Sequence, residues 1–275
     1  MSMRKIRKAL ALIYFYIYSR IAPAFLKLDD KAVVFLTDAH EKLDGNLKAI
    51  SDYIDEEYAD LKIKSFCRGD RRRAVSFSEF RAVCRAMSSC KYIILDDFYG
   101  LTSSMKLRNG QKLVQLWHGS GAFKKFGYSR LDGDMSPRAV HSGYRKYTGA
   151  LASSEGVRKC FAEAFDISVD KVRALGSPRS DILFDEDFKI VSKSKLISAF
   201  HELSGKKIIL FAPTYRGERV EAANYDFNKL EPEQFIKEIG EEYRVLVRWH
   251  PALLANVKSG RVNFKLPEGM IDVSD

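Results

Sequence analysis

The sequence predicts an α/β protein with parallel β-sheets in two domains. Short β-rich runs alternate with helical patterns, polar residues follow directly after the apolar runs, and the alternation restarts after a charged stretch at residues 184–205. With 275 residues, 46% of them apolar, the chain can form two cores and lacks the composition of a disordered protein. Each sheet is expected to be parallel and covered by helices on both faces.

The first domain is predicted to span residues 29–190. Three helices are expected in it. The first has Leu47 and Ile54 on one apolar face, and the second begins at a capping box formed by Ser76 and Glu79. The third runs from a cap at Ser154 through Phe165. The apolar runs between these helices are typical of buried strands. The expected strands are residues 31–36, 61–66, 91–95, 112–117, 149–153 and 171–176.

A second, shorter domain is predicted at residues 196–275. The preceding charged stretch is expected to hold a linker and one amphipathic helix through Leu196 and Phe200. Strands are then expected within 206–214 and 243–251, with a helix around 231–240, and a third strand candidate near the C-terminus. A doubly wound half-domain usually has more strands than these three.

The first 28 residues are predicted to form a separate helix on a membrane surface. Residues 9–18 are all apolar or aromatic, and basic residues flank them with no acidic residue in the first 27. The run is too short to span a bilayer, which needs about 20 residues, and no clear signal-peptidase site follows it. We expect Tyr14, Tyr16 and Tyr18 at the level of the lipid headgroups. The alternative is a helix packed on the first domain.

Polar residues directly follow five of the apolar runs. In an open parallel sheet these positions lie at the carboxyl edge, where ligands bind. The residues concerned are Thr37, Asp38 and His40, then Asp96 and Asp97, then His118, then Thr214 and Arg216, and finally His250. Two such edges facing one another would form an interdomain cleft.

His118 is the candidate general base. An imidazole titrates near neutral pH and can accept a proton from a hydroxyl nucleophile. It precedes Gly119 and Gly121, which we expect to relax the limits on φ and let a ligand approach the backbone, and Lys124 follows as a candidate phosphate contact. The alternative is a histidine that caps the next helix or is hydrogen-bonded in the core.

Three further groups are candidate anion sites. Arg248 and His250 are two residues apart on a strand and therefore share a face, where they can clamp a phosphate. Arg179 and Asp181 follow the strand at 171–176, where an ordinary turn with Ser180 or Asp181 as a helix cap is the alternative. Thr214 and Arg216 are candidates to hold a phosphate at the start of a helix.

Several other classes of site lack a motif in the sequence. The four cysteines form no CxxC pair, no P-loop spacing occurs, and no nucleic-acid motif accompanies the net charge of +10. The basic run at residues 71–73 is typical of a solvated face. Asp38, Asp96 and Asp97 leave room for a weak divalent-ion role, but no acidic cage predicts a dedicated metal.

Five separated segments in order resemble the CDP-glycerol glycerophosphotransferase family of teichoic-acid synthesis. They are "QLWHGSGAFKKFG" at 115–127, "ASSEGVRKCFAEAFDI" at 152–167, "LGSPRSDIL" at 175–183, "ILFAPTYRG" at 209–217 and "VRWHP" at 247–251. The likeness covers most of the chain from about residue 30. No single segment is specific, but their shared order and spacing are.

The resemblance implies a GT-B-like fold, with two Rossmann-like domains and a cleft between them. It also implies an enzyme without a cofactor, at the cytoplasmic face of the membrane, that transfers a polyol phosphate from CDP-glycerol or CDP-ribitol to a lipid-linked polymer and releases CMP. His118 matches the family's base and His250 a stabiliser of the donor phosphates. Nucleic acid is not an expected partner.

The family pattern continues beyond this sequence. Its members have a later "DYSS"-like motif at the donor phosphates, so the resemblance implies that the C-terminal domain is incomplete at Asp275. Two alternatives remain at this point. One is a GT-B glycosyltransferase that uses a nucleotide sugar, and the other is an inactive relative that acts as a binding module.

Overall fold

A computed structural model describes residues 3–69, 73–130, 142–217, 222–226, 229–262 and 265–274. The chain divides into two compact units, Met1–Phe184 and Asp185–Asp275. Each unit contains a sheet of parallel strands, as the alternation of strands and helices predicts.

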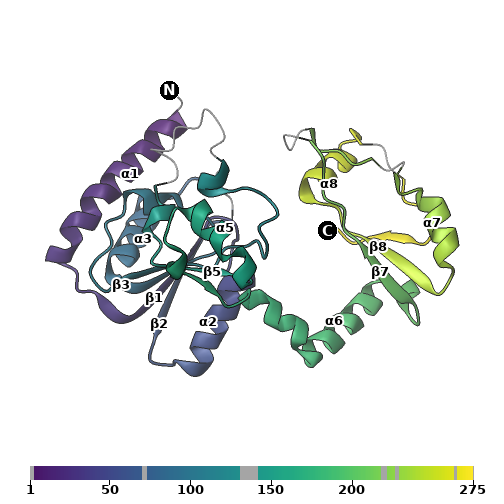
Figure 1. The fold of residues 1–275 in the computed structure, drawn as a ribbon, viewed down its shortest axis with the longest axis horizontal. Helices are drawn as coiled ribbons and strands as arrows, with labels where there is room; N and C mark the ends of the chain where they lie inside the picture. The colour runs from purple at the N-terminus through teal and green to yellow at the C-terminus, as the bar shows by residue number, and fades with distance from the viewer. Residues whose placement is uncertain are drawn as a thin grey trace. The chain divides into compact units, whose positions relative to one another are not determined.

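The sheet of the first unit has six parallel strands in the order β2-β1-β3-β4-β5-β6. Figure 1 labels β1, β2, β3 and β5 of this sheet. Every strand falls within or beside an apolar run that predicted it. The strands are β1 (Asp29–Thr37), β2 (Lys62–Cys67), β3 (Cys90–Leu95), β4 (Lys112–Gln115), β5 (Gly149–Ala152) and β6 (Val172–Ala174).

Helices cover both faces of this sheet because successive side chains of a strand point to opposite faces. On one face Val34 and Leu36 of β1 pack in a large core with side chains of α1 (Met3–Ile21), α3 (Phe77–Ser89) and α5 (Glu155–Phe165). On the other face Val33 and Phe35 pack with Leu47 of α2 (Gly45–Glu57).

The predicted capping box at the start of α3 is confirmed on its serine side. The Ser76 side chain accepts a hydrogen bond from the backbone N–H of Glu79. Ser154 occupies the N-cap position of α5, but its side chain makes no capping hydrogen bond. The predicted end of α5 at Phe165 is correct, and Asp166 closes the helix in the left-handed conformation.

One face of α1 packs on the first unit. Phe15 is completely buried in the core, and Tyr14 and Tyr18 pack against the same cluster. The expectation that these two tyrosines lie at lipid headgroups is therefore wrong, whereas Tyr16 is exposed. The opposite face of α1 carries an exposed apolar stripe of Ile6, Leu10, Ile13, Ile17 and Ile21. Of the helices in the described ranges, none combines the length and apolarity needed to cross a membrane.

Short 3₁₀ helices connect these elements. In the first unit they are Ala22–Ala24, Gly100–Ser104, Gly127–Arg130, Tyr144–Lys146, Val169–Lys171 and Pro178–Phe184. In the second unit one follows α6, at His201–Leu203.

The second unit begins with α6 (Glu186–Ala199), whose N-cap is Asp185. Its sheet has the parallel order β7-β8-β9, with β7 at Lys207–Phe211, β8 at Tyr243–Val247 and β9 at Met270–Asp272. The described part of this unit also contains the helices α7 (Pro232–Ile239) and α8 (Pro251–Lys258). Its core contains Val245, Val247, Trp249 and Leu253.

Candidate active site

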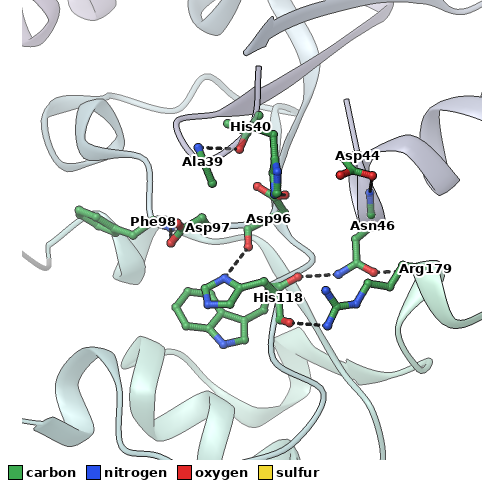
Figure 2. Close-up of polar contacts among 12 residues, drawn as sticks. Ala39, His40, Asp44, Asn46, Asp96, Asp97, Phe98, His118 and Arg179 are labelled. Atoms are coloured by element: carbon green, nitrogen blue, oxygen red, sulfur yellow. Dashed lines mark hydrogen bonds and ion pairs between the residues drawn. The ribbon is translucent and has the colours of Figure 1, made fainter. Parts of the chain in front are cut away.

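Three neighbouring strands of the first unit bring candidate residues to one sheet edge. The parallel strands β1, β3 and β4 end at Thr37, Leu95 and Gln115. His40, Asp96 and His118 follow these ends, so the three side chains lie at the same carboxyl edge (Figure 2). The sequence placed each of them after a strand, and the strand order makes them neighbours.

A left-handed residue directly before His118 sets the direction of the chain. Trp117 has φ of 58°, a conformation that costs free energy for a bulky residue. Its N–H donates to the Gln115 side chain at 2.8 Å, and its carbonyl accepts from the Asn46 amide at 2.6 Å. Its buried ring stacks on Phe126, with 4.4 Å between the ring centroids. The neighbouring His118 is exposed.

The expected role of the glycines after His118 is wrong in one respect. Neither Gly119 nor Gly121 has a positive φ. The unusual backbone conformation lies at Trp117, where hydrogen bonds to the N–H and carbonyl and the ring packing hold it. A proposed contact of Gly119 with a ligand stays a prediction.

Asn46, which is not among the predicted site residues, connects three segments of the site. Its buried side chain donates to the Trp117 carbonyl, and its Oδ1 accepts from the Ser177 hydroxyl at 2.9 Å and the Arg179 N–H at 3.0 Å. α2 thereby joins the segment before His118 to the segment after β6. A polar residue beside Leu47 in the first turn of a helix is the only sequence signal for it.

The hydrogen bonds of His118 fix the chemistry of its ring. Nδ1 lies 3.1 Å from the backbone oxygen of Asp96, and a carbonyl oxygen can only accept. In the neutral ring Nδ1 therefore carries the proton, and Nε2 keeps its lone pair. The ring stacks on Trp117 with 4.5 Å between centroids. An exposed imidazole held in this tautomer can act as a base through Nε2.

Arg179 lies beside His118, because its guanidinium donates to the His118 backbone oxygen at 2.8 Å (Figure 2). Asp181 is exposed on the same 3₁₀ helix, Pro178–Phe184. The alternative in which Ser180 or Asp181 caps the next helix is wrong, since Asp185 caps α6. A phosphate-binding role for Arg179 and Asp181 stays a prediction.

Asp96 is a buried carboxyl group beside His118. Burial raises its pKa, while a hydrogen bond from Thr37 and the nearby His40 oppose the rise. Its Oδ2 lies 3.8 Å from His40 Nε2, and its buried Oδ1 has no hydrogen-bond partner in the described part of the chain. A buried polar atom without a hydrogen-bond partner lowers the stability of the folded state.

The other two carboxylates after β1 and β3 have separate partners. Asp38 pairs with Arg68 at 3.7 Å, and Asp97 accepts from the Phe98 N–H at 2.6 Å. Within the ranges that the structure describes, no three His, Cys, Asp or Glu side chains form a group able to hold a metal ion. Lys124 lies exposed on the loop after His118. Of the predicted basic face, Arg71 and Arg72 lie outside the described residues, while Arg73 pairs with Glu79 at 2.8 Å.

The second unit holds the other predicted residues at the carboxyl edge of its own sheet. His250 caps α8, because its Nδ1 accepts the Ala252 N–H at 3.1 Å. In the neutral ring the proton is then on Nε2, which can donate to an anion. Arg248 and His250 are both exposed, while Trp249 between them is buried. β8 ends at Val247, so the prediction that both residues lie on a strand is wrong, although the alternation of exposure still places the arginine and histidine on the same side.

Thr214 and Arg216 do not start a helix. Both side chains are exposed, but the Arg216 backbone pairs with Asn224 in an antiparallel bridge. The expectation of a phosphate held at a helix N-terminus is therefore wrong at this position. Tyr215 between them contacts the His250 ring, with 4.8 Å between centroids, which brings the segment beside the α8 cap.

Comparison with known proteins identifies the family of the chain. The family model described as CDP-Glycerol:Poly(glycerophosphate) glycerophosphotransferase matches residues 17–275. The chain belongs to this family. The match confirms the resemblance drawn from the five sequence segments.

Curated relatives of this glycerophosphotransferase family member include both polymerases and primases. The teichoic acid poly(ribitol-phosphate) polymerase of Bacillus spizizenii is 34% identical over 90% of this chain and 40% of its own length. The teichoic acid glycerol-phosphate primase of Bacillus subtilis is 27% identical over 92% of this chain and 68% of its own length. The chain spans between 40 and 48% of the length of three ribitol-phosphate polymerases.

A solved structure supports the fold assignment. The wall teichoic acid polymerase TagF matches all of this chain and 71% of its own with a TM-score of 0.66, at 18% identity. The UDP-GlcNAc 2-epimerase of Neisseria meningitidis covers 89% of this chain with a TM-score of 0.52, at 13% identity, and 72% of its own chain is matched. These likenesses confirm the predicted α/β, GT-B-like fold class.

Replacement of Asn46 by alanine should destabilise the first unit. The Asn46→Ala variant leaves the Trp117 carbonyl and the Arg179 N–H without their partner, and an unsatisfied buried group costs about 1–3 kcal/mol. Urea unfolding followed by fluorescence should show this loss, while Lys48→Ala on the same helix should stay within about 0.5 kcal/mol. Equal stabilities of the two variants would contradict the linking role of Asn46.

Replacement of Asp96 by asparagine should change the pH dependence of stability. Because burial raises the Asp96 pKa, the folded state binds more protons than the unfolded state between the ordinary and the raised pKa. Ionisation of Asp96 therefore lowers the free energy of unfolding as pH rises, and Asp96→Asn removes that effect. Thermal unfolding from about pH 4 to about pH 8 should show the variant gaining stability relative to the wild type. A difference that does not change with pH would contradict the raised pKa.

Proposed function

We propose that this chain transfers a polyol phosphate from a CDP-polyol to a hydroxyl group of a lipid-linked polymer and releases CMP. The observation that carries the proposal is the exposed His118 ring, held by the Asp96 carbonyl with Nε2 unprotonated. Family membership supports the reaction class. TagF in a crystal soaked with CDPG, H444N variant, is among the similar structures.

In the proposed reaction His118 Nε2 takes the proton of the acceptor hydroxyl. The resulting oxygen attacks the phosphorus that carries the polyol, and the bond from that phosphorus to the bridging oxygen breaks. CMP leaves with the electrons of this bond, and the polymer gains one polyol phosphate. Arg179, Lys124 and the Gly119 backbone are the residues of the first unit that we propose to contact phosphate oxygens.

The second unit is proposed to bind the donor. His250, with its Nε2–H directed away from the cap, and Arg248 on the same face are suited to hold the diphosphate. Thr214 and Arg216 lie in the segment whose Tyr215 contacts His250. Positive charge and oriented donors at these positions stabilise the negative charge that builds up on the leaving group.

The comparisons support both glycerol and ribitol as the polyol. Three ribitol-phosphate polymerases are 32–34% identical to the chain, and three glycerol-phosphate primases are 27–29% identical. Both CDP-glycerol and CDP-ribitol therefore belong in the assay. A glycosyltransferase using a nucleotide sugar would usually release a nucleoside diphosphate, so the released nucleotide distinguishes the two reactions.

The outer face of α1 supports attachment to the cytoplasmic face of an anionic membrane. Its exposed isoleucine and leucine stripe lies beside Lys5, Arg7 and Lys8, which are also exposed. Phe15 and the hydrogen bond from Arg20 to the Ser104 carbonyl hold the helix on the domain. An apolar stripe beside basic residues matches the boundary between headgroups and acyl chains.

The first test is CMP release from each CDP-polyol with a lipid-linked polyol-phosphate acceptor. His118→Ala should reduce the rate by about 10²- to 10⁴-fold, because it removes the general base. His201→Ala, which removes an exposed imidazole in the second unit, should leave the rate unchanged. A wild-type chain that releases no CMP with either donor would contradict the proposed function, and equal rates for both variants would exclude His118 as the base.

Membrane attachment is tested by sedimentation with anionic phosphatidylglycerol vesicles. The double change Leu10→Glu and Ile17→Glu should reduce binding by at least about tenfold, because each side chain loses apolar burial. The matched control, Ile190→Glu with Val191→Glu, alters two exposed apolar residues of α6. If both double variants bind as the wild type does, α1 is not the membrane contact.

A further inference from the structure

The sequence predicted His40 at the carboxyl edge of the sheet, but His40 has no role in the proposed transfer reaction. It follows β1, while Asp96 follows β3 and His118 follows β4, and these strands are adjacent. Figure 2 shows the Asp96 residue between the two imidazoles. Its backbone oxygen accepts from His118, and its carboxylate faces His40. One residue therefore contacts the proposed base on one side and a second histidine on the other.

The loop that carries His40 is fixed to the end of β2. The His40 carbonyl accepts from the Gly69 N–H at 2.8 Å, and the Thr37 hydroxyl oxygen accepts from the Ala39 N–H at 3.1 Å. Gly69 has φ of +73°, and a Cβ there would lie 2.3 Å from the Glu41 side chain. A glycine is thus required for this close approach. These contacts hold the backbone at His40 against the segment that follows β2.

The spacing between the His40 and Asp96 side chains fits a hydroxyl group of a ligand. The two side chains are 3.8 Å apart between Nε2 and Oδ2, which is too long for a direct hydrogen bond. The His40 side chain is 43% exposed and that of Asp96 is 6% exposed, so a ligand can approach from the His40 side. A hydroxyl group both accepts from an imidazole N–H and donates to a carboxylate. It can bridge the two groups, which a phosphate oxygen beside the carboxylate cannot do without charge repulsion.

We infer that His40 and Asp96 bind a second hydroxyl group of the acceptor, adjacent to the hydroxyl that His118 deprotonates. This rests on the proposed function, because it assigns the neighbouring hydroxyl of the same acceptor polyol. The raised pKa of Asp96 agrees with a carboxyl group that is costly to bury and is kept for binding. His40 is then a specificity residue that favours acceptors with vicinal hydroxyls over simple alcohols.

The inference is tested by NMR of the full chain labelled with ¹⁵N-histidine, which has five imidazole groups. The probes are glycerol 3-phosphate and 1,3-propanediol monophosphate, which lacks the middle hydroxyl. Glycerol 3-phosphate should shift the signals of both His40 and His118, assigned with single substitutions. Its dissociation constant should be about three- to tenfold lower than that of the deoxy probe. This is the gain in affinity expected when one hydroxyl group accepts a hydrogen bond from His40 and donates one to Asp96.

Variants separate binding by His40 from a structural effect. In His40→Ala the two probes should bind within about twofold of one another, because the group that distinguishes them is gone. His40→Gln, which keeps a side-chain N–H donor, should retain part of the discrimination, and His201→Ala should retain all of it.

The remaining outcomes of these experiments would contradict this inference, the proposed function or both. Discrimination that survives in His40→Ala, or a shift of His118 without one of His40, would overturn this inference and leave the proposed function intact. Shifts at both histidines in a chain that releases no CMP would support the acceptor site but contradict the transferase. If glycerol 3-phosphate shifts neither signal, the acceptor does not bind at this edge and both proposals fail.

Discussion

The site depends on the left-handed conformation of Trp117. Between a buried strand and His118 the chain turns at a bulky residue, which requires compensation from its surroundings. Gln115 holds the N–H, Asn46 holds the carbonyl, and Phe126 stacks on the ring. These contacts together make the exposed position of His118 the stable one.

Asn46 extends this constraint to the rest of the first unit. Through one amide it joins α2, the turn before His118 and the segment after β6. Arg179, fixed by the same amide, returns a hydrogen bond to the His118 carbonyl. A network with all its members satisfied is rigid, and rigid placement of a base is what proton transfer needs.

The two histidines of the proposed reaction are held in opposite tautomers. His118 donates from Nδ1 to a carbonyl, which leaves Nε2 as an acceptor. His250 accepts at Nδ1 from the Ala252 N–H, which leaves Nε2 as a donor. The same residue type after a strand thus serves as a base in one unit and as an anion-binding donor in the other, because backbone groups of different kinds face Nδ1.

The sequence by itself determined the strands, the α-helices described in the first unit and the family. Apolar runs of strand length and the spacing of Ser76 and Glu79 depend on neighbours along the chain, so local patterns report them. His118 and His250 were predicted because they follow strands in segments that resemble the family. The tertiary structure alone decided the rest. The hydrogen bonds of Asn46, one of which holds the Trp117 carbonyl, join residues 71 to 133 positions apart that the fold brings together. The pairing of His40 with Asp96 depends on the adjacency of β1 and β3. Likewise, only packing showed that α1 buries Phe15, packs Tyr14 and Tyr18 against the same core and exposes the stripe opposite, because periodicity does not say which face of a helix meets the core.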